Sequence, residues 1–269
     1  MDVMEEGKAR CREIRSRILD LAFRSGKNGS HLGGSLSAVE ILDALYHSGY
    51  DFTPSFEQRD RMILSKGHAA LAHYCVLESI GILTAEEADS FEKNGTSFFA
   101  HARRCVEKGI EFSGGSLGLG ASFAVGVALA CRAKGYDNRV FVLLGDGECD
   151  EGVVWESLMA AVHYHLDNLT FIIDSNGLQS DGYTKDVMNH APLEERCKGF
   201  GAAVVTVDGH DQQALLSAFQ ERAVGVPSVI IARTVKGKGV SFMENQPSWH
   251  HGVLDWQQYE QALGEVLHG

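Results

Sequence analysis

Short apolar runs alternate with longer amphipathic stretches along most of the chain. Residues 5–24 place Ile14, Ile18 and Leu21 on one face and charged residues on the other, which is the spacing of an amphipathic helix. Similar patterns predict further helices over residues 37–46, 67–80, 117–134, 152–165 and 211–224. Four short, apolar runs predict strands at 139–145 (RVFVLLG), 169–174 (LTFIID), 202–207 (AAVVTV) and 228–233 (SVIIAR).

The predicted strands are apolar at successive positions and do not alternate in polarity. Strands with this pattern are buried on both faces, and predicted helices lie between them. We therefore predict an α/β fold in which helices cover both faces of a parallel sheet. Because no internal repeat or proline-rich linker interrupts the chain, we expect one domain over residues 1–235. Residues 236–269 are expected to form a C-terminal extension that packs on it.

Composition and charge narrow the possible functions. The 269 residues are 44% hydrophobic and 22% charged, which is typical of a globular protein. With 24 basic against 36 acidic residues, we expect no nucleic-acid partner, because such binding depends on Lys and Arg neutralising phosphates. The most apolar stretch, 117–131, is broken by glycines and too short to cross a bilayer, so we expect no membrane association.

The cysteines and the N-terminus indicate a cellular compartment. The six cysteines have neither CxxC nor His/Cys metal spacing, so we interpret them as reduced thiols. The first 23 residues are acidic and then mixed in charge, without the apolar region of a signal peptide. We therefore expect a cytoplasmic protein.

Polar side chains follow two of the predicted strands. GDG (145–147) ends the run at 139–145, and SNG (175–177) follows the run at 169–174. Because ligands of such sheets bind beyond the carboxyl ends of the strands, we expect Asp146 and Asn176 to face one crevice. A carboxylate and an amide oxygen suit Mg²⁺, which completes its coordination with water and phosphate oxygens. The alternative is that both are ordinary turns and that Glu148, Asp150 and Glu151 only cap the next helix.

Both turns belong to longer segments that resemble the transketolase family. GDGECDEGVVWESLMAA and LTFIIDSNGLQSDG resemble the thiamine diphosphate motif of that family, in which an Asn follows GDG. The resemblance continues over SGKNGSHLGGSLSAVEIL (25–42), RMILSKGHAALAHY (61–74), GIEFSGGSLGLGASFAVGVALA (109–130), VDGHD (207–211) and RTVKGKGVSFMENQPSWHHG (233–252). It implies that residues 1–235 form the thiamine diphosphate-binding (PP) domain. The chain is similar to the N-terminal subunit of a split transketolase.

The resemblance implies a site for a metal ion and a cofactor. Asp146, the Asn176 side chain and the Leu178 carbonyl would bind Mg²⁺ or Ca²⁺ together with diphosphate oxygens. The other cofactor contacts implied by the matching motifs are His68, Gly115, Ser116, Leu117, Gly147 and His250.

The resemblance also implies which residues act in the reaction. Imidazole groups near the reacting atoms can donate, accept or exchange protons near neutral pH. In WHHG two histidines are possible, and ungapped matching favours His250 over His251. Glu151 and Glu156 match a carboxylate network that links paired active sites in the family; the alternative is a solvated helix face. The full set of implied catalytic residues is His31, His68, His101, His250, His251, Glu151 and Glu156.

The implied reaction is the transfer of a two-carbon ketol unit from a ketose to an aldose, as sugars or sugar phosphates. In the family, a glutamate on the pyrimidine-binding domain activates the cofactor. We therefore expect this chain to be inactive alone and to need a separately encoded C-terminal transketolase subunit, in an α₂β₂ assembly.

Two departures from the family pattern leave the sugar specificity open. His31-Leu32 replaces His-Pro, and Ala100-His101-Ala102 replaces Gly-His-Pro. Two other functions also remain as alternatives. One is a subunit of another thiamine diphosphate enzyme, similar to 1-deoxyxylulose-5-phosphate synthase or to a 2-oxoacid dehydrogenase. The other is a non-catalytic partner domain.

Overall fold

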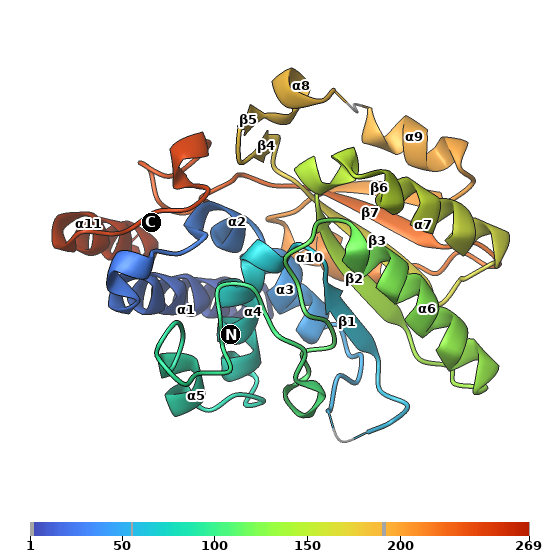
Figure 1. The fold of residues 1–269 in the computed structure, drawn as a ribbon, viewed down its shortest axis with the longest axis horizontal. Helices are drawn as coiled ribbons and strands as arrows, with labels where there is room; N and C mark the ends of the chain where they lie inside the picture. The colour runs from blue at the N-terminus through green and yellow to red at the C-terminus, as the bar shows by residue number, and fades with distance from the viewer. Residues whose placement is uncertain (1–2, 55, 190–191, 269) are drawn as a thin grey trace.

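Five parallel strands form the central sheet of the computed structural model (Figure 1). The structure describes residues 3–54, 56–189 and 192–268. Across the sheet the strands are β1 (Arg61–Leu64), β2 (Val140–Gly145), β3 (Leu169–Ser175), β7 (Ser228–Arg233) and β6 (Ala203–Asp208). The predicted parallel sheet and its four predicted strands are confirmed. The sequence pattern does not predict β1, because a run of four residues that begins with arginine is a weak strand signal.

Both faces of the sheet are buried, as the lack of alternation predicted. Phe141 and Leu143 of β2 belong to the hydrophobic core on one side of the sheet. Val140, Val142 and Leu144 of the same strand belong to the core on the other side. Successive side chains of a strand point to opposite faces, so a strand between two helical layers is apolar at every position.

Helices cover the two faces of the sheet in separate layers (Figure 1). One layer consists of α6 (Leu119–Ala133), α7 (Gly152–His163) and α9 (Leu193–Gly199). The other has α3 (Val39–Tyr46) and α10 (Gln212–Gln220), with α1 (Val3–Arg24), α2 (Leu32–Ser37) and α4 (Ala70–Ser79) packed in the same core. All the predicted helices are present, although α10 ends at Gln220 and residues 67–69 form a 3₁₀ turn.

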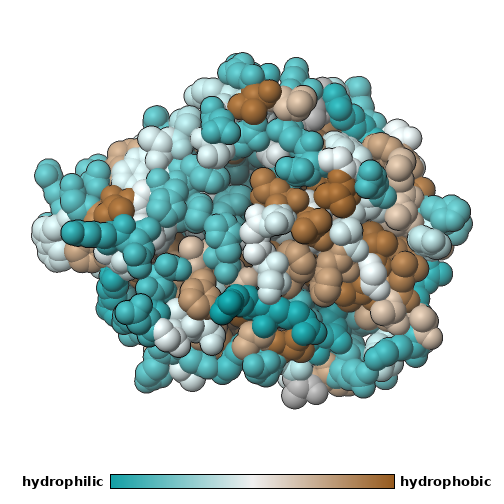
Figure 2. All heavy atoms as spheres, viewed as in Figure 1, coloured by the Kyte–Doolittle hydropathy of each residue, from teal (hydrophilic) through white to brown (hydrophobic). Residues whose placement is uncertain are grey.

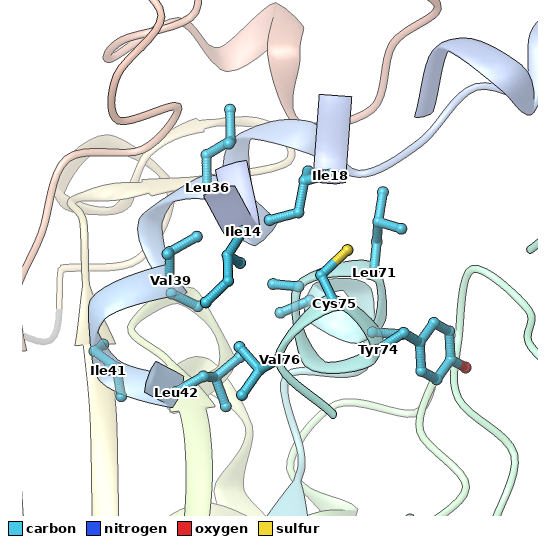
Figure 3. Close-up of a cluster of buried hydrophobic side chains, with 14 of the residues drawn as sticks. Ile14, Ile18, Leu36, Val39, Ile41, Leu42, Leu71, Tyr74, Cys75 and Val76 are labelled. Carbon is cyan, nitrogen blue, oxygen red and sulfur yellow. The ribbon is translucent and has the colours of Figure 1, made fainter. Parts of the chain in front are cut away.

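The core between the sheet and the second layer contains branched aliphatic side chains together with buried aromatic ones such as Tyr74, Phe141 and Phe219. Figure 3 shows Ile14 and Ile18 of α1 close to Leu71 and Cys75 of α4, with Leu42 of α3 nearby. All five side chains are buried. The buried helix α2 packs against α1 and α4 in the same core.

Short elements complete the chain. The antiparallel pair β4 (Leu178–Gln179) and β5 (Gly182–Tyr183) follows β3. The remaining short helices are α5 (Ala85–Asp89), α8 (Thr184–Val187), η1 (Gly26–Asn28), η2 (Gly67–Ala69), η3 (Val106–Lys108), η4 (Gly147–Asp150) and η5 (Pro247–Trp249). None of the helices in the described ranges is both long and apolar enough to span a membrane.

The C-terminal helix α11 (Trp256–His268) packs on the N-terminal helix α1. The rings of Phe23 and Tyr259 are stacked with their centroids 4.6 Å apart. Ala262 and Val266 are buried in the same core as α1. The division of the chain at residues 235 and 236 stays a prediction.

Candidate active site

The turns that follow β2 and β3 lie side by side at the carboxyl edge of the sheet. β2 and β3 are neighbours, with Gly145 opposite Asp174. The Asp146 carboxylate accepts hydrogen bonds from the amides of Gly147 (2.9 Å) and Gly177 (2.5 Å). The Asn176 side-chain oxygen accepts one from the Leu178 amide at 3.1 Å. The expected proximity is confirmed, and these turn contacts hold both oxygens in place.

A pocket of about 260 Å³ opens at this edge. It brings together ten of the residues expected from the sequence: His31, His68, His101, Gly115, Leu117, Asp146, Gly147, Asn176, Leu178 and His250. Ser116, Glu151, Glu156 and His251 are not among its lining residues. A second cavity of about 300 Å³, near the ends of β6 and β7, shares only Asp146 with it.

Histidine rings converge on His31 at the start of α2. The ring centroids of His101, His250 and His68 lie 5.1, 5.5 and 5.9 Å from that of His31. The ring of His251 is also close, at 4.7 Å, but this residue is exposed. Segments far apart in the sequence therefore supply one cluster of imidazoles. The assignment of His250 rather than His251 to the reaction stays a prediction.

Burial lowers the pKa of the four histidines that line the pocket, His31, His68, His101 and His250. Burial, and then the neighbouring His101, lowers the pKa of His31 to about 3. Burial, and then the Lys236 ammonium, lowers the pKa of His250 to about 4. Burial also lowers the pKa of His68 well below its ordinary value. A neutral imidazole has one donor and one acceptor nitrogen, so at neutral pH each ring can both give and receive a hydrogen bond.

Two buried lysines that the sequence pattern does not single out adjoin the pocket. Lys66 is 1% exposed, forms an ion pair with Asp174 and donates to the Gly34 carbonyl at 2.9 Å. Lys236 is also 1% exposed and donates to the Leu178 carbonyl at 3.3 Å. Its Nζ lies 3.0 Å from Nδ1 of His250. Each lysine follows the end of a strand, Lys66 after β1 and Lys236 after β7, but no sequence pattern marks either one as buried.

The electrostatics of the pocket favour cationic and anionic ligands together. Burial raises the pKa of Asp146 to about 6, and the Asp174 carboxylate adds to that rise. A cation beside Asp146 would stabilise its charged form. Burial lowers the pKa of Lys236 to about 8, with Lys66 as the second cause, and an anion would reverse that shift.

The donors and acceptors fit a diphosphate with a bound metal ion. Asp146, Asn176 and the Leu178 carbonyl offer oxygens, which are the ligands of Mg²⁺ and Ca²⁺. Lys66 and His68 line the pocket, and the Lys236 ammonium lies beside two of its lining residues, Leu178 and His250. All three can offer N–H groups to phosphate oxygens. Within the described part of the chain, buried Nδ1 of His31 and Nε2 of Gln179 have no hydrogen-bond partner. Both residues line the pocket.

Glu151 and Glu156 lie outside the pocket, at the start of α7 and on its exposed face. The apolar residues Leu117, Leu119 and Met159 are 40%, 48% and 49% exposed, on the turn before α6, on α6 and on α7. Figure 2 shows hydrophobic side chains gathered over the part of this surface where α6 and α7 lie. The carboxylate-network role of the two glutamates stays a prediction.

Sequence and structure comparisons agree with this geometry. Residues 10–264 match the family described as "Transketolase, thiamine diphosphate binding domain". An apulose-4-phosphate transketolase subunit of Phocaeicola vulgatus is 37% identical, over 94% of this chain and 90% of that protein. The 6-deoxy-6-sulfo-D-fructose transketolase subunit SqwG of Clostridium sp. is 39% identical, over 90% of each.

A solved transketolase from Leishmania mexicana has the same fold. It superimposes with a TM-score of 0.87 at 26% identity, over 97% of this chain. The match spans only 41% of the Leishmania chain, so this chain corresponds to less than half of that enzyme. By its family match and its relatives, the chain belongs to the transketolase family, as its thiamine diphosphate-binding domain.

Proposed function

We propose that this chain is the thiamine diphosphate-binding subunit of a two-component transketolase, which transfers a two-carbon ketol unit from a ketose to an aldose. The observation that carries this proposal is the common pocket of Asp146, Asn176 and the histidine cluster. Relatives that match over most of their length are named as transketolase subunits, which supports a second polypeptide.

The proposed metal ion is Mg²⁺, or Ca²⁺ in its place. Asp146, Asn176 and the Leu178 carbonyl would bind it, and Lys236 would move from that carbonyl to a diphosphate oxygen. When bound, thiamine diphosphate supplies the nucleophilic carbon and the electron sink needed to break a carbon–carbon bond. His68, Gly147 and the turn at 115–117 would hold the cofactor against this wall.

The histidines provide the groups that would contact the sugar. His31, His101 and His250 line one pocket, and burial lowers the pKa of each ring, which favours its neutral form at pH 7. Neutral rings can donate to a sugar hydroxyl and take its proton as the carbon–carbon bond breaks. We assign proton transfer to these three residues and diphosphate binding to His68.

The substrate is proposed to be a ketose with an anionic terminal group. Two of the relatives are named for apulose-4-phosphate and for 6-deoxy-6-sulfo-D-fructose, which carry a phosphate and a sulfonate. We propose that the substrate of this chain belongs to the same class of anionic ketoses, without assigning either of these two sugars to it.

The partner is proposed to be a separately encoded subunit that carries the pyrimidine-binding domain, in an α₂β₂ complex. The apolar surface of Leu117, Leu119 and Met159 adjoins the pocket through Leu117, which also lines it. Exposed apolar patches of this kind indicate protein contacts. Glu151 and Glu156 would then lie near the interface between paired active sites, and the complex would be cytoplasmic.

The test is to mix the purified chain with its candidate partner, thiamine diphosphate and Mg²⁺. Phosphorylated, sulfonated and neutral ketoses are screened as donors against a panel of aldoses. We expect turnover only with both proteins present and only with anionic donors. Full activity of this chain alone, or reaction with a 2-oxoacid in place of a ketose, would overturn the proposal.

A further inference from the structure

Glu148 is a buried carboxylate directly behind the Asp146 turn. It lies in η4, is 2% exposed and contributes to the wall of the pocket. Its Oε1 accepts hydrogen bonds from the Ser65 hydroxyl and, at 2.7 Å, from the Gly118 amide. Its Oε2 accepts one from the Gly145 amide at 3.0 Å. One side chain therefore joins three separate segments.

Each of these segments carries groups that face the pocket. Ser65 begins the turn with Lys66 and His68, and Gly118 follows the turn at 115–117. Gly145 begins the turn with Asp146. Glu148 is therefore hydrogen-bonded to the segment that carries the proposed diphosphate donors, to the segment that follows the glycine turn, and to the start of the turn that carries the proposed metal ligand.

Two of these segments, around Ser65 and around Gly118, pack closely against each other. A Cβ on Gly67 would come within 2.8 Å of the Gly115 nitrogen, and one on Gly120 within 2.7 Å of the Ser65 Cα. No side chain can separate these two segments. The amides of Ser65 and Lys66 also donate to the Leu143 carbonyl of β2, so the link that Glu148 adds is the one between the Gly118 segment and the turn after β2.

We propose that Glu148 is a positioning residue, which fixes the three segments at the spacing that the cofactor needs. The proposal rests on the proposed function, because it assigns the pocket to thiamine diphosphate. Glu148 acts through its neighbours and makes no contact with the reacting atoms.

The hydrogen-bond pattern explains why a carboxylate is required here. The amides of Gly118 and Gly145 can only donate, and each uses a different oxygen of Glu148. Glutamine has the same shape but only one acceptor oxygen, so one amide would face an NH₂ group. Ser65 can rotate its hydroxyl, but neither amide can. The isosteric substitution therefore breaks one connection without opening a cavity.

The matched control is Glu111, another buried carboxylate. It is 8% exposed and pairs with Arg59 and Arg61 at the start of β1, away from the carboxyl edge of the sheet. Glu111→Gln measures the general effect of weakening a buried carboxylate. Ser65→Ala is a milder second variant, which removes one donor to Glu148 and leaves the amides paired.

The experiment has two readouts. Thiamine diphosphate affinity is measured by calorimetry in Mg²⁺ on the complex of the chain with its partner subunit. Backbone hydrogen exchange is measured by mass spectrometry on the cofactor-free full chain. For Glu148→Gln we expect affinity to fall about tenfold or more, the scale of an unpaired buried donor. We expect faster exchange confined to the peptides around Ser65, Gly118 and Gly145.

Other outcomes separate the inference from the proposed function. Wild-type affinity in Glu148→Gln would overturn the positioning role alone, and so would an equal loss of affinity in Glu111→Gln. If Glu148→Gln fails to fold, Ser65→Ala must weaken cofactor binding with little change in unfolding midpoint, and unchanged binding would overturn the inference. A wild-type complex that binds no thiamine diphosphate would contradict the proposed function and the inference with it.

Discussion

The Asp146 carboxylate accepts a hydrogen bond from the Gly177 amide at 2.5 Å, so the turn after β2 holds the turn after β3. This contact leaves Asp146 and Asn176 on one wall of the pocket, within reach of the same ligand. Because both turns follow neighbouring parallel strands, the sheet itself sets their separation. The position of the proposed metal site is therefore set by the sheet and its two adjoining turns.

Replacing Lys236 by Met removes the ammonium group and keeps a long side chain. We expect affinity of the complex for thiamine diphosphate to fall about tenfold to a hundredfold, because hydrogen bonds to charged groups contribute roughly 1.5–3 kcal/mol. Lys238→Met is the control, since the Lys238 ammonium lies 3.5 Å from Glu244 on a more exposed surface. Calorimetry on both variants makes the comparison. Equal affinities for Lys236→Met and wild type would show that the lysine holds no phosphate.

Acid should destabilise the cofactor-free chain partly through His31. Its pKa lies near 3 in the folded protein against an ordinary value of 6.5, with burial as the main cause. The unfolded chain therefore binds more protons between these values, and the free energy of unfolding falls as pH drops below about 6.5. We expect His31→Gln to reduce this loss by on the order of 2 kcal/mol at pH 4.

Urea unfolding of wild type and His31→Gln at several pH values between 4 and 7 measures the effect. The exposed His268, at the end of α11, gives the control substitution His268→Gln. Identical pH dependence in His31→Gln and wild type would mean that His31 is not held neutral by the fold.

A charge placed on the apolar surface should prevent assembly. Met159 is 49% exposed on α7, so Met159→Glu should leave the fold of the isolated chain unchanged. We expect its affinity for the partner subunit to fall at least about tenfold, because central apolar contacts carry much of the binding energy of an interface. Val224→Glu is the control, at a residue 91% exposed in the loop after α10. Analytical ultracentrifugation of each variant mixed with the partner subunit measures assembly. If Met159→Glu assembles at the same concentrations as wild type, this surface is not the interface with the partner.

The sheet was predictable because its strands are buried on both sides. Val140 to Leu144 are all apolar since the two helical layers each bury alternate residues of β2. The same pattern does not identify β1, which is four residues long, or α9, which is seven. Elements this short contain too few positions to distinguish a strand or helix period from a loop.

The site was predictable where a short motif fixes the chemistry. GDG and SNG follow two strands that are consecutive in the predicted order and neighbours in the sheet. Their polar groups therefore meet at the same edge of the sheet. The positions of Lys66 and Lys236 were not predictable because lysine is normally exposed, and only tertiary packing reveals that these two are buried. For Glu148 the local sequence suggests only a helix cap, because its partner Gly118 lies on a segment that no local pattern connects to it.

The most direct test of the central claim is calorimetric titration of thiamine diphosphate into the Asp146→Ala complex, with and without Mg²⁺. The exposed Asp186, on α8, gives the control Asp186→Ala. If Asp146 binds the metal ion that holds the diphosphate, Asp146→Ala loses Mg²⁺-dependent binding while its circular dichroism stays that of wild type. Mg²⁺-dependent binding of wild-type strength in Asp146→Ala would contradict the claim.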